Sequence, residues 1–113
     1  MIEVVLHEYL NGFFGGRPVV YSEVPENPAP EYVVFEHTGG KKTDKVKMSV
    51  FALQSVSTSL LRAATLNERV IEAMELLPTR DEVAACYLNS DYNFTDPESE
   101  KYRYQAVFNI THY

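Results

Sequence analysis

The chain has 113 residues, which is enough for one domain around a single modest core and too few for two. Hydrophobic residues make up 45% of it and charged residues 23%, as is typical of a globular protein that folds without help. The formal charge of −6 argues against a protein that grips nucleic acid, because phosphate contacts need clustered lysines and arginines. The basic residues cluster in one place, interrupted by Asp44: Lys41, Lys42, Lys45 and Lys47.

The N-terminal segment predicts a short helix. Residues 2–10 carry apolar side chains at helical spacing, and Asn11-Gly12 supplies an exit from the helix. The segment also contains Glu3 and His7 and lacks the basic start of a targeting sequence. No apolar run in the chain reaches the roughly 18 residues of a membrane span. We therefore expect a soluble protein that is intracellular when made and has no membrane partner.

The next segment predicts two strands joined by a stiff arm. Residues 17–24, RPVVYSEV, fit a strand at a sheet edge, because Pro18 cannot donate a ladder hydrogen bond. Three prolines then fix an extended approach to the strand EYVVFEHTG: Pro25, Pro28 and Pro30. The sequence leaves open whether this arm is a rigid connection or a contact surface.

A turn and a third strand follow. The glycine-rich, charged GGKKTD predicts the turn, and KVKMSVFALQ predicts the strand. One face of this strand begins with Lys47 and Ser49 and ends with Phe51 and Leu53. We expect the strand to leave solvent partway along its length.

The second half predicts one amphipathic helix and two strands. The stripe along STSLLRAATLNERVIEAMELLP predicts a helix that Ser57 or Thr58 caps and Pro78 ends. EVAACYLNSDYNF and KYRYQAVFNITHY predict strands on either side of the turn TDPESE. The order is helix, strand, strand, strand, helix, strand, strand. We expect a single α+β domain over residues 1–113, with an antiparallel or mixed sheet of about five strands packed by two helices.

The candidate chemical groups do not form a catalytic or metal-binding pattern in the sequence. His7, His37 and His112 lack partners at metal-ligand spacing, and HTGGKK lacks the spacing of a phosphate loop. Cys86 lies in the apolar stretch VAACYL, so we expect it in the core, and a lone cysteine excludes an intramolecular disulfide. We expect no enzyme activity, no cofactor and no metal.

Aromatic residues crowd the C-terminal third of the chain. Cross-strand packing accounts for most of them, but tyrosines that remain on an exposed face suit a protein interface. The candidate interface residues there are Tyr92, Phe94 and Tyr113.

The whole pattern resembles the tail terminator, or tail completion, proteins of long-tailed phages and prophages, which are also called minor tail or minor capsid components. Three stretches carry the resemblance. They are VVYSEVPENPAPEYVVFEHTGG, then VKMSVFAL leading into LLRAATLNERVIEAMELL, and finally NSDYNFTDPESEKYRYQAVFNITHY, which looks like that family's closing D-x-x-x-x-D/E-P-E-x-x-x-Y-R hairpin. HTGGKKTDKVK is longer and more charged than the family's usual turn.

The resemblance implies a non-enzymatic subunit of a ring, typically a hexamer, at the head-proximal end of the tail tube. Such a ring stops tube growth and presents the docking surface for the head-tail connector, and DNA passes through its lumen without specific binding. The implied location is the virion tail, after assembly in the cytoplasm of the bacterial host. We expect the segments Pro25–Pro30 and Lys41–Lys45 to contact neighbouring subunits or the tube.

Two alternatives remain at this point. One is a head completion or connector protein that joins head to tail. The other, from a different class, is a small α+β ligand-binding or enzyme domain whose pocket uses His37 or His112 together with tyrosines.

Overall fold

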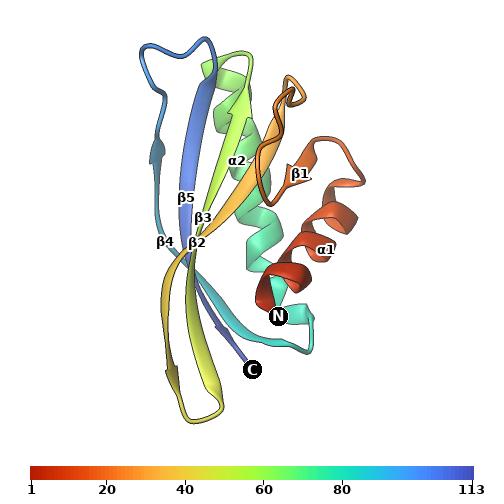
Figure 1. Cartoon of the computed structure of the whole chain (residues 1–113), viewed down its shortest axis with the longest axis vertical. Helices are drawn as coiled ribbons and strands as arrows, with labels where there is room; N and C mark the ends of the chain where they lie inside the picture. The colour runs from red at the N-terminus through yellow and green to blue at the C-terminus, as the bar shows by residue number, and fades with distance from the viewer.

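A computed structural model describes residues 1–113 as one α+β fold, in which two helices pack against one face of a five-stranded sheet (Figure 1). The elements in chain order are α1 (Ile2–Phe14), β1 (Val19–Tyr21), β2 (Tyr32–Thr43), β3 (Val46–Ser57), α2 (Leu60–Glu75), a 3-10 turn (Leu77–Thr79), β4 (Val83–Asn93) and β5 (Tyr102–His112). The predicted fold class, the number of strands and the order of the elements are confirmed.

The sheet is mixed, with the strand order β1-β2-β3-β5-β4. β1 pairs with β2 in parallel, and every other neighbouring pair is antiparallel. Since parallel neighbours cannot be joined by a tight turn, residues 22–31 must carry the chain back to the start of β2. The proline arm is therefore a crossover connection, whatever else it contacts.

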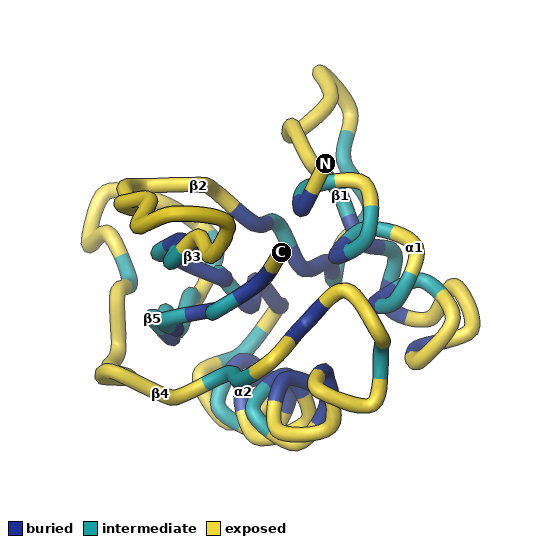
Figure 2. Tube along the Cα trace, turned by 90° about the horizontal axis from the view of Figure 1, so that it is seen from below, coloured by how far each residue is buried: buried dark blue, intermediate teal, exposed yellow.

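The core lies between the helices and the inner face of the sheet (Figure 2). β3 and β5 are central strands and supply its middle, where alternate residues are fully buried, as the alternation in the sequence predicts. Burial of each large apolar side chain contributes about 1.5–3 kcal/mol. The large buried side chains include Leu6, Leu10, Phe51, Leu53, Val70, Met74, Phe108 and Ile110.

Helix α1 is longer than the sequence pattern predicts. It continues past Gly12 to Phe14 and ends at Gly15, which adopts the left-handed conformation with φ 64° and whose N–H donates to the Asn11 carbonyl. Phe14 extends the buried stripe by one more step of four residues, so burial of its ring favours another turn of helix. The predicted end at Asn11-Gly12 was wrong for this reason.

Helix α2 is capped by Ser59, and not by Ser57 or Thr58 as predicted. The Ser59 hydroxyl accepts a hydrogen bond from the Arg62 N–H at 3.1 Å, whereas Ser57 still belongs to β3 and donates to Glu31. The helix ends at Glu75, and Pro78 lies in the 3-10 turn that follows. Neither α1 nor α2 combines the length and the hydrophobicity that crossing a lipid bilayer requires.

The connection between β2 and β3 differs most from the prediction. Gly39, Gly40, Lys41 and Lys42 are strand residues of β2, and the turn consists only of Asp44 and Lys45. A β-bulge between His37 and Gly39 lets the glycines join the ladder. The result is a long two-stranded hairpin in place of a glycine-rich loop.

Candidate functional site

The β2–β3 hairpin projects beyond the helices and forms one end of the molecule, whose longest dimension is 44 Å (Figure 1). From Glu36 to Lys47 every residue is exposed, so this part of the hairpin contributes little to the core. Along β3 the burial changes from exposed Lys47 to buried Ser49 and fully buried Phe51, which confirms that the strand leaves solvent partway.

The projecting hairpin is the basic part of an acidic protein. Its tip, residues 41–47, holds four lysines and one aspartate. The charge of the tip is therefore +3, while the whole chain carries −6. The structure contains two ion pairs, Glu3–His37 and Arg80–Glu82, so none of the hairpin lysines is paired within the chain. The predicted residues Lys41, Lys42 and Lys45 are therefore together at the tip and free to meet a partner.

Gly40 is required where the two hairpin strands approach closely. A Cβ atom at this position would lie 2.5 Å from the Met48 carbonyl oxygen, closer than side chains and backbone tolerate. The neighbouring Gly39 has open space around the same position. The close approach of the β3 backbone therefore excludes a side chain at Gly40 but not at Gly39.

Gly40→Ala is expected to lower the free energy of unfolding by about 1–3 kcal/mol, because the strands must move apart to admit the methyl group. Gly39→Ala is the matched control, and its stability should stay within about 0.5 kcal/mol of the wild type. Urea unfolding followed by circular dichroism measures both variants. Equal stabilities of the two variants would contradict the close approach at Gly40.

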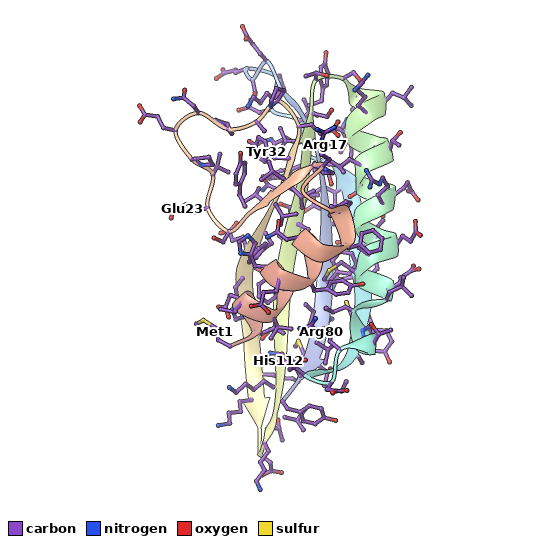
Figure 3. All side chains as sticks on the ribbon, turned by 90° about the vertical axis from the view of Figure 1, so that its right-hand side faces the viewer. Met1, Arg17, Glu23, Tyr32, Arg80 and His112 are labelled. Atoms are coloured by element: carbon purple, nitrogen blue, oxygen red, sulfur yellow. The ribbon has the colours of Figure 1, made fainter.

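At the base of the hairpin, polar side chains from four elements form two hydrogen-bonded pairs, and Figure 3 labels one of these residues, His112. His37 of β2 lies 3.2 Å from the Glu3 carboxylate of α1 and stacks on the Phe51 ring with 4.6 Å between centroids. A hydrogen bond of 2.7 Å joins Ser49 Oγ on β3 to His112 Nε2 on β5. These contacts lock the hairpin base to α1 and β5.

The charge states in this cluster follow from their contacts. The hydrogen bond from the backbone lowers the pKa of Glu3, and the hydrogen bond from His37 acts in the same direction. Burial lowers the pKa of His112, and the hydrogen bond with the Tyr113 backbone opposes that effect. The buried imidazole of His112 is therefore neutral near pH 7.

His112 should make the stability depend on pH. The folded protein holds the His112 proton less tightly than the unfolded chain, so stability is full above the ordinary histidine pKa of about 6.5 and falls as the pH drops toward the lower folded-state pKa. His112→Gln retains a hydrogen-bonding side chain but cannot titrate. The melting temperature of the wild type should fall more between about pH 7 and about pH 5 than that of the variant. Parallel falls would contradict this assignment.

Ser49 and His112 also resemble a nucleophile with its base, which bears on the enzyme alternative. Each residue is only 5% exposed, and the group next to His112 Nδ1 is the Tyr113 backbone carbonyl at 3.4 Å rather than a carboxylate. The adjoining hollow of about 520 Å³ is lined by His37, Ser49 and hairpin lysines. In this geometry the Ser49–His112 bond ties β3 to β5 and does not present an exposed nucleophile.

Strand β4 forms the second exposed feature. It pairs only with β5, so its other edge has unpaired backbone groups. Tyr87 is 68% exposed, and Leu88 and Tyr92 are also exposed on this strand. Two bulges interrupt its register with β5, between Val83 and Ala85 and between Leu88 and Ser90.

The structure separates the three aromatic residues that the sequence singled out. Tyr92 and Phe94 lie together at one end of the β4–β5 pair, with 5.9 Å between ring centroids, and Arg103 lies over the Phe94 ring. Tyr113 lies beyond the other end of the pair, where its N–H donates to the Glu82 carbonyl. All three are exposed, but only Tyr92 and Phe94 share one surface.

The predicted arm residues Pro25, Pro28 and Pro30 lie in a connection that is largely exposed and far from the hairpin tip. Its ends are fixed: the Ala29 N–H donates to the Tyr21 hydroxyl at 3.1 Å, and the Tyr21 ring packs on Tyr32. The arm is therefore anchored at its ends and presents its middle to solvent.

Sequence reasoning missed Tyr87 and Leu88 as exposed residues. Apolar and polar residues occur on both faces of β4, and the bulge after Leu88 changes the face to which the following side chains point.

Cys86 packs against the core as predicted, and burial raises the pKa of its thiol to about 12. No group of three or more histidine, cysteine, aspartate or glutamate side chains lies close enough together to hold a metal ion.

No protein-family model matches this sequence, and no curated protein is significantly similar to it.

Proposed function

We propose that this protein is a structural subunit of a phage or prophage tail that forms a ring at the head-proximal end of the tail tube. The ring stops tube growth and provides the docking surface for the head-tail connector. The observation that carries the proposal is the projecting β2–β3 hairpin, whose residues from Glu36 to Lys47 are exposed although they form a ladder with a single bulge. A long ordered hairpin outside the core presents a contact surface to a partner.

The exposed edge of β4 supports the same proposal. A subunit in a ring needs two different surfaces, one for each neighbour, and further surfaces for the tube and the connector. The hairpin, the proline arm and β4 with Tyr87, Tyr92 and Phe94 provide such surfaces on different sides of one small domain. The expected ring size, a hexamer, comes from the resemblance to tail terminator proteins.

The charge of the chain suits a lumen through which DNA passes. At a formal charge of −6, acidic walls repel phosphate and avoid trapping the genome. In this proposal the protein acts by shape and surface complementarity, without catalysis, cofactor or membrane. It works in the virion tail after assembly in the cytoplasm of the bacterial host.

A tube growth assay tests this function. Purified protein is added, at increasing molar ratios, to the polymerising tail tube protein encoded beside its gene, and tube lengths are measured by negative-stain electron microscopy. Mean tube length should fall as the protein concentration rises, because each capped end stops growing. Tubes of unchanged length and uncapped ends would overturn the terminator role.

The same preparation separates the terminator from a connector. A connector should attach to DNA-filled heads and leave tube growth unchanged, whereas a terminator should act on tubes in the absence of heads. Binding to heads alone, without an effect on tubes, would favour the head completion protein.

A further inference from the structure

The acidic counterpart of the lysine hairpin lies in the proline arm. Residues 22–31 contain three glutamates and no lysine or arginine: Glu23, Glu26 and Glu31. None of these carboxylates forms an ion pair within the chain, and only Glu31 accepts a side-chain hydrogen bond, from Ser57 at 2.7 Å. Glu23 and Glu26 are both exposed, and Figure 3 shows Glu23 on the arm.

The arm and the hairpin tip lie in opposite halves of the molecule. The hairpin tip forms one end of the 44 Å long axis, whereas the arm joins β1 and β2 in the other half (Figure 1). Both are fixed by ladder pairs or hydrogen bonds at their bases, so the two segments of one chain cannot meet. Within a single subunit, no ion pair therefore joins the lysines of the hairpin to the carboxylates of the arm.

We propose that the lysine hairpin of one copy docks on the acidic proline arm of a second copy. The hairpin tip carries +3 and the arm carries −3, so the two surfaces match in sign and size. The prolines reduce the conformational freedom that the arm loses on docking. The inference deepens the proposed function and rests on it for the biological setting, because it identifies what joins neighbouring subunits of the ring.

The charge of the rest of the protein favours a second copy over nucleic acid as the partner. The chain carries −6 in total and the hairpin tip +3, so all other residues together carry −9. A surface of that sign repels phosphate at long range and attracts the lysines of another copy. Lys101 lies over the Tyr32 ring at 5.2 Å, and neither Lys101 nor Arg17 forms an ion pair with a carboxylate of the arm.

Such a contact is heterologous, because it joins two different surfaces of identical subunits. After the first contact forms, one subunit of the pair still has a free arm and the other still has a free hairpin. Association can then continue from copy to copy and close into a ring. An isologous dimer, by contrast, uses the same surface of both copies, so no third copy can bind through that surface.

Two neutralised variants test the contact without any tail tube. One is Lys41→Gln/Lys42→Gln/Lys45→Gln/Lys47→Gln, and the other is Glu23→Gln/Glu26→Gln/Glu31→Gln. Sedimentation velocity is measured for each protein at up to about 1 mM and at about 0.01 M ionic strength, where charge interactions reach furthest. Wild type should form species larger than dimers, and added salt should dissociate them. Each variant alone should self-associate about 10- to 100-fold more weakly.

The decisive sample is an equal mixture of the two variants. The intact hairpin of one variant can bind the intact arm of the other, but the neutral segments block further growth, so the mixture should stop at dimers. Wild type that stays monomeric at about 1 mM would overturn the proposal. Variants that assemble like wild type, or a mixture that stays monomeric, would do the same.

The controls keep this test separate from the proposed function. Circular dichroism checks that each variant is folded, and Glu23→Gln/Glu26→Gln repeats the arm test with the Ser57–Glu31 hydrogen bond intact. If the mixture fails but the wild type still caps tubes, the contact between hairpin and arm is wrong and the terminator role stands. If the mixture forms dimers but the wild type does not cap tubes, the terminator role is wrong.

Discussion

Phe51→Ala should lower the free energy of unfolding by about 3–5 kcal/mol, which is a large part of the 5–15 kcal/mol that holds a typical domain together. Phe51 is fully buried in the central strand β3, where its ring lies 6.1 Å from that of Phe35 and 4.6 Å from that of His37. Alanine would leave a cavity in the core between the sheet and the helices. It would also remove the ring on which His37 stacks.

The matched control is Val50, the residue that precedes Phe51 in β3. Val50 is only partly buried and points to the opposite face of the sheet, so Val50→Ala should lower stability by about 1 kcal/mol. Urea unfolding followed by circular dichroism measures both variants under the same conditions. If Phe51→Ala costs no more stability than Val50→Ala, the core has been placed on the wrong face of β3.

A shortened hairpin should abolish tube capping while the fold survives. The variant lacks Lys42 and Thr43 from β2 and Val46 and Lys47 from β3, so the Asp44-Lys45 turn closes on the pair Lys41–Met48. Removal of two residues from each strand keeps every remaining side chain on its original face. The hairpin becomes shorter by about 7 Å and should no longer reach its partner.

The four deleted residues are exposed, so the free energy of unfolding should change by less than about 1 kcal/mol. Melting temperature and the tube growth assay are measured on the same preparation. A folded variant that caps tubes as well as the wild type would contradict the role of the hairpin. Gly39→Ala serves as the control, since it alters the hairpin without changing its length or packing.

The sequence was sufficient to predict the arrangement of elements, because apolar periodicity and burial agree along most of the chain. In β5, the alternation from Gln105 to Thr111 matches the burial, whereas Tyr102, expected on the buried face, is exposed. In α2 the stripe faces the core. Boundaries were less predictable where tertiary contacts decide them. Burial of Phe14 lengthens α1 beyond Gly12, and the choice of Ser59 as cap depends on how far β3 extends.

The candidate surfaces were only partly predictable for the same reason. Glycine and lysine in GGKKTD favour a turn locally, but a bulge and pairing with β3 draw them into a strand. Whether Tyr92, Phe94 and Tyr113 share a surface depends on the ends of the β4–β5 pair at which they lie. The charge match between hairpin and arm becomes meaningful only when the fold places these segments in opposite halves of the molecule.

The most direct test of the ring at the tube end is to locate the protein on assembled tails. A tagged protein is bound to tubes of its tail tube protein, labelled with gold particles and viewed by negative-stain electron microscopy. If the protein forms a ring at the tube end, gold should lie at one end of each tube and not along its length. Gold spread along the tubes, or tubes without gold at either end, would contradict it.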